Sequence, residues 1–225
     1  MKNRLDKYFR AWYNFIYKER EEDYCFLGIF RITLGSFILV HFMFFMNDFY
    51  LLYAKGGIIS YDIMISFSSS TGLNIPLLSD FIIKWTTVSE ETSYNIISAC
   101  YITLSICLIC GLFTRISSLF LILLHIAIFN GSQLYSYGVD LFTSIALFYC
   151  FIFPTNAQFS LDKKIFRKKG TNPGPYRKIL QIHLCIVYVS SGFVKILGQD
   201  WRTGEAVWQA LHQIRHNITI PLNFV

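Results

Sequence analysis

Five runs of mostly apolar residues dominate this sequence, and each is long enough, or nearly so, to cross a lipid bilayer as a helix. A membrane-spanning helix needs about 20 apolar residues. The runs cover residues 25–46, 92–113, 116–130, 139–157 and 177–198. Only 15% of the residues are charged, whereas a soluble domain carries about 25%. We therefore predict an all-α, multi-pass membrane helical bundle with about five spans, and not a soluble enzyme.

Basic residues are distributed unevenly among the segments that connect these runs. Fourteen Lys or Arg side chains lie in residues 1–24, 114–115 and 158–178, whereas the alternate connecting segments hold four. Cytoplasmic loops of membrane proteins carry the excess of basic residues. The pattern predicts a cytoplasmic N-terminus and a C-terminal tail on the outer side. Because the basic clusters flank apolar runs, they are typical of topology signals and lipid contacts, and we predict no nucleic-acid partner.

Two segments outside the runs have unusual compositions. Residues 1–24 mix basic and aromatic side chains, which predicts a cytoplasmic amphipathic segment at the membrane interface, followed by a single transmembrane domain over 25–225. The outer loop 47–91 is too apolar for a solvated loop. We expect it to fold onto the outer end of the bundle as short helices, although a flap on the membrane surface is the alternative. In a bacterium the membrane would be the inner, cytoplasmic one.

Lys195 is the first candidate site residue. Helical spacing places Tyr188, Ser191, Gly192 and Lys195 on one face of the last run, where the small residues allow close approach of a helix or a ligand. A partly dehydrated lysine loses some of its affinity for protons and becomes a usable base. The alternative is that Lys195, three residues from the end of the run, extends to the outer interface.

Arg31 and Asp140 are the other ionisable candidates in the runs. A charge at the centre of a span costs about 2.5–3.5 kcal/mol, so its presence needs a reason. Arg31 either pairs with an acid or backbone carbonyls inside the bundle or extends to the inner surface. Asp140 begins the fourth run on the predicted outer side, where it either pairs with Lys195 or stabilises the helix N-terminus.

Metal and redox sites receive weak support. His212 and His216 are four residues apart on one helix face, and His41 and His125 are candidates for a similar depth, but no acidic ligand completes the pattern. Cys107 and Cys110 form a CxxC motif inside an apolar run, where packing explains them better than thiol chemistry. We predict no metal site.

The last run and the residues after it, YVSSGFVKILGQDWRTGEAVWQAL (188–211), resemble a motif of the HTTM superfamily. That motif is G-x-x-K followed by D-W-x-x-G, and the superfamily shares its membrane domain with vitamin K-dependent gamma-carboxylases. Other segments resemble the superfamily in the same order along nearly the whole chain: FRITLGSFIL (30–39), CGLFTRIS (110–117), YSYGVDLF (135–142) and FPTNAQFSLDKK (153–164). In size the chain is most similar to the SdpB-like bacterial branch.

The resemblance to the carboxylases implies a role for Lys195 and a quinone. In those enzymes the motif lysine is the base proposed to deprotonate vitamin K hydroquinone, so a reduced quinone is the implied cofactor. Three features depart from the carboxylases. The spacing from Lys195 to Trp201 is one residue longer, Gln133 stands near the position of a carboxylase histidine, and no large C-terminal domain follows the last run.

Three functions follow as alternatives. The resemblance to SdpB-like proteins implies a factor for maturation or export of a secreted antimicrobial peptide, with that peptide and a small SdpA-like protein as partners. The second is a reduced carboxylase-like enzyme with Lys195 as base, and the third is a non-catalytic membrane scaffold or immunity protein. Whether the chain is an enzyme stays open.

We place the site in an outward-facing cavity between the first, fourth and fifth runs, beneath the loop 47–91. Its catalytic candidates are Lys195, Asp140 and Tyr188, and its lining candidates are Arg31, Ser191, Gly192 and Trp201.

Overall fold

Every element that the structure describes is an α-helix, which confirms the all-α part of the prediction. The computed structural model describes residues 10, 13–15, 17, 21–58, 63, 73–130, 137–166 and 174–212. The chain divides into two compact units, residues 1–175 and 176–225. Most of the predicted N-terminal amphipathic segment, much of the loop 47–91, Gln133 and His216 lie outside the described residues.

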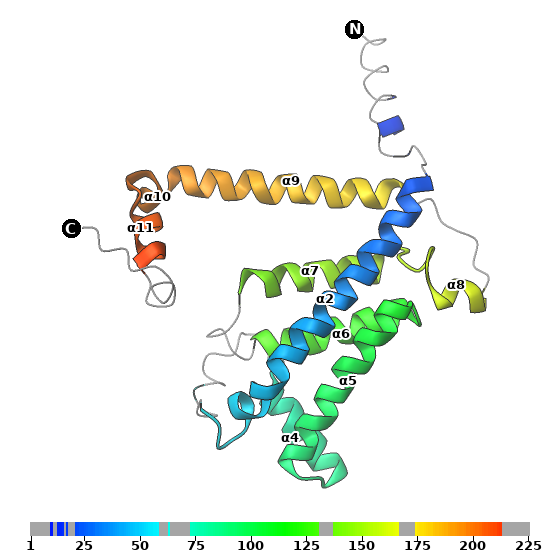
Figure 1. The fold of residues 1–225 in the computed structure, drawn as a ribbon, viewed down its shortest axis with the longest axis vertical. Helices are drawn as coiled ribbons and strands as arrows, with labels where there is room; N and C mark the ends of the chain where they lie inside the picture. Colours follow the sequence, from blue (N-terminus) through cyan, green and yellow to red (C-terminus); the bar gives the residue numbers. More distant parts are fainter. Residues whose placement is uncertain are drawn as a thin grey trace. The chain divides into compact units, whose positions relative to one another are not determined.

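The helices follow the predicted runs closely (Figure 1). Those of the first unit are α2 (Glu21–Tyr53), α4 (Ile75–Thr86), α5 (Glu90–Cys110), α6 (Thr114–Asn130), α7 (Gly138–Ile152) and α8 (Leu161–Phe166). The chain continues with α9 (Gly174–Leu197), α10 (Gln199–Thr203) and α11 (Glu205–His212).

Three of these helices are long and apolar enough to cross a membrane: α2 over Cys25–Tyr53, α5 and α9. The predicted third and fourth spans correspond to shorter apolar helices, α6 and α7, with 17 and 15 residues. Together these helices support an integral membrane protein.

Two predicted boundaries are wrong. The first helix continues past residue 46 to Tyr53, because Phe49 and Tyr53 are buried and extend the aromatic packing of α2. The fourth ends at Ile152 and not at 157, because Phe153 precedes Pro154 and takes an extended conformation with ψ of 151°. A residue before proline disfavours the helical region.

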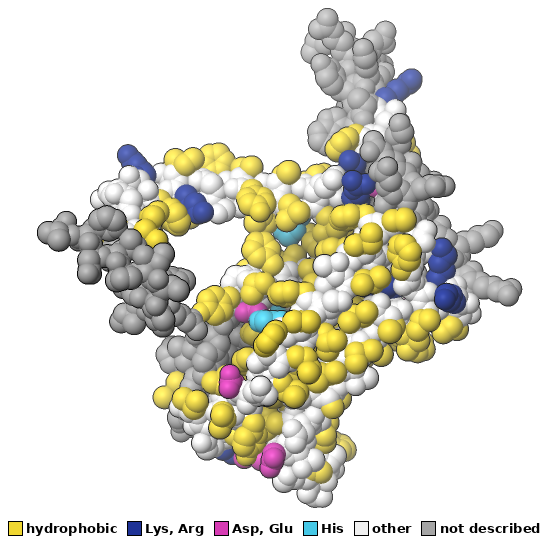
Figure 2. All heavy atoms as spheres, viewed as in Figure 1, with side chains coloured by type: hydrophobic (Ala, Val, Ile, Leu, Met, Phe, Trp, Pro, Cys, Tyr) yellow, Lys and Arg dark blue, Asp and Glu magenta, His cyan; other side chains and the backbone are white. Residues whose placement is uncertain are grey.

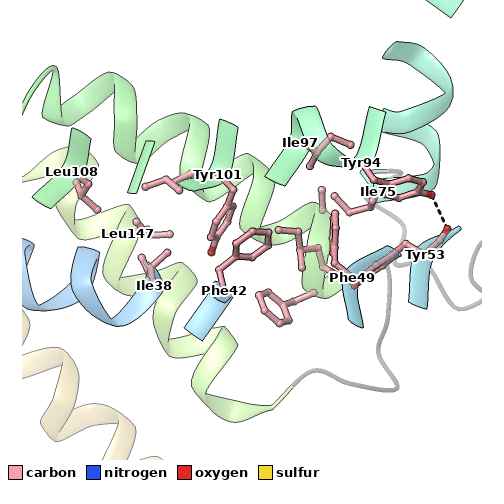
Figure 3. Close-up of a cluster of buried hydrophobic side chains, with 14 of the residues drawn as sticks. Ile38, Phe42, Phe49, Tyr53, Ile75, Tyr94, Ile97, Tyr101, Leu108 and Leu147 are labelled. Carbon is pink, nitrogen blue, oxygen red and sulfur yellow. Dashed lines mark hydrogen bonds between the residues drawn. The ribbon is translucent and has the colours of Figure 1, made fainter. Parts of the chain in front are cut away.

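The helices α2, α5, α6 and α7 form the bundle of the first unit. The helix α5 packs between α2 and α6, and α7 packs against α6 and α2. Figure 3 shows the apolar side chains between them, where Phe42 of α2 meets Tyr101 of α5 with ring centroids 4.4 Å apart. Leu108, Leu121 and Leu147 complete this core without exposure to solvent.

Buried tyrosines connect the ends of three helices. The Tyr94 hydroxyl of α5 donates to the carbonyl of Tyr53 at the end of α2, at 2.6 Å (Figure 3). The Tyr53 hydroxyl donates in turn to the carbonyl of Ile128 in α6. Because each hydroxyl has a partner, the tyrosines fill the apolar core without leaving a polar group unsatisfied.

The described part of residues 47–91 packs onto the same end of the bundle. The helix α4 lies against α5, and the hydroxyls of Ser79 and Ser93 form a hydrogen bond between them. Lys55 strengthens this end, since its Nζ lies 2.9 Å from Asp80 and its backbone N–H donates to Glu90.

The surface of the first unit is largely apolar along its helices and charged at its ends. Figure 2 shows hydrophobic side chains spread over one face of these helices. Among the exposed ones is Phe44, which is 79% exposed. Basic side chains such as Lys163 and Lys164 belong to the end with α8, and acidic ones such as Glu90 and Glu91 to the end with α4. An apolar band between charged ends is the arrangement that a bilayer requires.

Candidate functional site

Arg31 lies inside the bundle of the first unit, near the start of α2. Its side chain is 0% exposed, and its Nη2 donates a hydrogen bond of 2.7 Å to the carbonyl of Phe159. The Nε and Nη1 atoms have no hydrogen-bond partner among the described residues. Arg31 therefore pairs with a backbone carbonyl, as one of the two sequence interpretations expected, and does not extend to the surface.

Gly111 makes room for the Arg31 guanidinium. It ends α5 in the left-handed conformation, with φ of 69°, and its N–H bonds back to the last turn of the helix. A Cβ atom at this position would lie 1.6 Å from Arg31 Nη1. Both the backbone conformation and the close approach of the guanidinium require glycine here.

Asp162 fixes the turn between α5 and α6 beside Arg31. Its carboxylate accepts hydrogen bonds from the backbone N–H groups of Phe113, at 2.8 Å, and Thr114, at 3.1 Å, at the start of α6. Its own N–H donates to the carbonyl of Gly111 at 3.0 Å. Burial alone would raise the pKa of this carboxyl, but the hydrogen bonds from Thr114, Phe113 and Asn156 outweigh burial and lower the pKa. We call Arg31, Gly111, Phe159 and Asp162 the Arg31 centre.

Asp140 lies in a second polar cluster, at the first turn of α7. Its side chain is buried, and its Oδ2 accepts a hydrogen bond of 2.7 Å from the N–H of Tyr137. Its Oδ1 has no hydrogen-bond partner among the described residues and lies 4.0 Å from Nδ1 of His41. One oxygen thus caps the helix, which is the dipole role expected from the sequence, and the other faces a histidine of α2.

His125 connects α5, α6 and α7 within this cluster. Its Nε2 lies 3.1 Å from the carbonyl oxygen of Asp140, and its Nδ1 lies 2.9 Å from the hydroxyl of Tyr101. A carbonyl oxygen only accepts hydrogen bonds, so Nε2 must carry the proton. For a neutral imidazole Nδ1 is then the acceptor, and the Tyr101 hydroxyl donates to it. His125 is therefore fully satisfied and holds the first turn of α7 in place.

His41 occupies a slot between two aromatic rings. Its ring stacks on Phe37 of the same helix and on Phe129 of α6, with centroid distances of 5.6 and 5.7 Å. Its side chain keeps 35% of its surface exposed in the first unit, whereas that of Asp140 keeps 5%. We call His41, Asp140, His125 and Tyr101 the His41–Asp140 centre.

Lys195 lies in the second unit, close to Trp201. Its Nζ is 4.6 Å from the centroid of the Trp201 ring, a cation–π contact between the end of α9 and α10. Tyr188 is 76% exposed within this unit, and a Cβ at Gly192 would meet nothing within 4 Å. Together with Ser191, these residues form an open face of α9. Lys195 and Asp140 belong to different units, so the predicted cavity and their pairing stay predictions.

The described residues contain no group of three or more His, Cys, Asp or Glu side chains arranged to hold a metal ion. His212 is the last residue of α11, and its side chain lies outside the described set, as does His216. Cys107 and Cys110 of the CxxC motif are free thiols.

Sequence reasoning missed the partners of both centres. It considered His41 and His125 only as metal ligands and gave Tyr101 and Gly111 no role. The sequence did carry a signal for His41, His125 and Tyr101. Each is a polar residue inside an apolar run, where a polar group needs a partner. The glycine of CGLF was visible as a helix end, but its contact with Arg31 depends on a side chain 80 positions away.

The HTTM domain family matches residues 19–224, which is nearly the entire chain. The chain belongs to the HTTM family. No curated protein and no solved structure matches the sequence. Segments that the sequence analysis compared with this family meet in the first unit of this HTTM protein. Residues 30–39, 110–117 and 153–164 supply the Arg31 centre, and 135–142 supplies Asp140 of the second centre.

Proposed function

We propose that this HTTM-family membrane protein is an SdpB-like factor that matures or exports a secreted antimicrobial peptide. Its expected partners are that peptide, a small SdpA-like protein and the surrounding lipid. The observation that carries the proposal is the resemblance of colinear segments to the HTTM domain, together with their convergence on buried polar centres. Three segments separated by up to about 130 residues meet at Arg31. We expect such long-range contacts if the segments that resemble the HTTM domain together build its fold.

The proposed orientation puts the His41–Asp140 centre in the outer half of the membrane. The excess of basic residues at the α8 end of the bundle favours a cytoplasmic position for that end. His41 lies ten residues beyond Arg31 along α2, or about 15 Å further toward the opposite side. In this proposal the protein crosses a bacterial inner membrane with five spans. A secreted peptide would meet its outer side during or after export.

The second candidate function is a reduced carboxylase-like enzyme in which Lys195 acts as a base. The Trp201 ring, 4.6 Å from Lys195 Nζ, orients the lysine within its own unit. Because this contact stabilises the ammonium form, Lys195 would have to leave the ring to act as a base. A quinone would supply the redox chemistry in such an enzyme. The exposed face of Tyr188, Ser191 and Gly192 beside Lys195 is the surface that a quinone would contact.

The mass of the secreted peptide tests the proposed function. We expect cells that make both the proposed secreted peptide and this protein to release a mature, active peptide. Cells that make the peptide without this protein should release none. A peptide of identical mass and activity in both cases would contradict the proposal. Extra carboxyl mass on the peptide, present only with this protein, would instead support the carboxylase-like enzyme.

Substitutions at Lys195 separate catalysis from a passive position at the interface. If Lys195 is a base, Lys195→Met abolishes the mature peptide while the protein still inserts at the normal level, because methionine keeps the length but accepts no proton. If Lys195 only extends to the interface, Lys195→Arg and Lys195→Gln both support near-normal yields. The matched control is Lys84→Met, which removes an exposed lysine from α4 and should change neither insertion nor yield.

A further inference from the structure

The His41–Asp140 centre contains a buried acceptor and a half-exposed histidine that the proposed function does not use. Asp140 is 4% exposed, and its Oδ1 has no hydrogen-bond partner among the residues that the structure describes. A buried carboxylate oxygen without a hydrogen-bond partner destabilises the folded protein. The side-chain nitrogen that faces this oxygen is Nδ1 of His41, 4.0 Å away, which is longer than a hydrogen bond but close enough for the carboxylate to act on it electrostatically. The carboxylate is stabilised most when Nδ1 of His41 carries a proton.

We propose that His41 forms a binding site in which its Nε2 accepts a hydrogen bond from a neutral hydroxyl group on an apolar molecule. Asp140 is the positioning residue of this site, because its carboxylate, 4.0 Å from Nδ1, favours the neutral tautomer with the proton on Nδ1 and leaves Nε2 as the acceptor. Among the described residues Nε2 has no hydrogen-bond partner of its own. This site is separate from Lys195 and from peptide maturation, and its test needs neither.

The rest of the centre fixes this geometry. The Asp140 side chain cannot turn freely, because Oδ2 is held by Tyr137 and the backbone carbonyl of Asp140 is held by His125. His125 is braced in turn by Tyr101. Phe37 and Phe129 flank the His41 ring and set its plane. A site whose supporting side chains are locked in this way presents its acceptor in one direction.

The apolar neighbours select the class of ligand. The two phenyl rings beside His41 offer no charge or hydrogen bond to a ligand, so a charged molecule would lose its hydration there without compensation. A neutral hydroxyl needs one acceptor, which Nε2 provides. An apolar ring or chain attached to that hydroxyl packs against Phe37, which is 40% exposed.

Nitrogen-15 NMR of the full chain in lipid nanodiscs tests the positioning by Asp140. With labelled histidine, and with each signal assigned by a single His→Gln variant, we expect neutral His41 to carry its proton on Nδ1 and His125 on Nε2. Asp140→Asn should reverse the tautomer of His41, because the asparagine carbonyl can keep the bond to Tyr137 while its amide turns an N–H toward His41. Asp80→Asn, which removes a surface carboxylate bound to Lys55, should leave both tautomers unchanged.

A matched pair of small molecules tests the ligand class. Addition of 4-hexylphenol should shift the Nε2 signal of His41 and leave that of His125 in place, whereas 4-hexylanisole, which lacks the hydroxyl hydrogen, should shift neither. Equal shifts with both molecules, or no shift with the phenol, would overturn the ligand assignment. A proton on Nε2 of neutral His41 in the unsubstituted protein would overturn the whole site, even if the Asp140 variant fails to fold.

Discussion

Gly111→Ala is expected to destabilise this protein more than any other single methyl addition in the bundle. The new Cβ would lie 1.6 Å from Arg31 Nη1 and 2.5 Å from the Cβ of Ser160, and φ at this position is 69°. A left-handed conformation costs a residue with a side chain about 1 kcal/mol, and forced repacking of a filled core adds about 1–3 kcal/mol. Arg31 cannot simply move away, because its guanidinium would lose the bond to Phe159 inside the bundle. We expect a loss of about 3 kcal/mol.

Unfolding of the purified protein in mixed micelles, followed by circular dichroism as denaturing detergent is added, measures this loss. The matched control is Gly56→Ala, since a Cβ at Gly56 would meet nothing within 4 Å and its φ is not positive. The control should stay within about 0.5 kcal/mol of the original protein. If the two variants unfold together, the contact between Arg31 and Gly111 is not part of the folded protein.

His125→Leu is expected to cause the second large loss. The substitution leaves the Tyr101 hydroxyl buried without its acceptor and removes one donor from the Asp140 carbonyl, which keeps the hydroxyl of Ser144. An unsatisfied buried polar group costs about 1–3 kcal/mol, so we expect about 2–3 kcal/mol for this variant. Tyr101→Phe removes only the hydroxyl and should cost about 1 kcal/mol, since it leaves His125 with its bond to Asp140.

The double variant decides whether these two side chains act together. When both partners of a buried hydrogen bond become apolar, no polar group of the pair is left unsatisfied, and the cost falls. We therefore expect the loss in Tyr101→Phe/His125→Leu to be smaller than the sum of the single losses by about 1 kcal/mol, measured by the same unfolding assay. Additive losses would show that Tyr101 and His125 do not form the bond.

The positions of the helices could be predicted from the sequence because lipid imposes one simple rule. Every backbone polar group must be satisfied within the span, so apolar length alone identifies the helices. The rule fails at the ends, where other forces act. Packing of Phe49 and Tyr53 carries α2 past the predicted end, and Pro154 stops α7 before it.

Only some residues of the two polar centres could be predicted from the sequence. Arg31 and Asp140 stood out because a charge in an apolar run is costly. Their partners did not, because the bond from Arg31 joins α2 to a carbonyl 128 residues away, and a backbone carbonyl carries no sequence signal. The same holds for His125, whose partners are a tyrosine 24 residues before it and a backbone oxygen 15 residues after it. The spacing of residues along one helix predicts which side chains share a face of that helix. It does not predict which other helix packs against that face.

The sidedness of the chain tests the account most directly, because the proposed function requires the C-terminal tail, which follows Lys195, to lie on the outer side of the membrane. Alkaline phosphatase, which is active only outside the cytoplasm, and a fluorescent protein that matures only inside it can each be fused after Val225. We predict high phosphatase activity and no fluorescence in a bacterial inner membrane. Bright fluorescence with inactive phosphatase would place the tail in the cytoplasm and contradict the account.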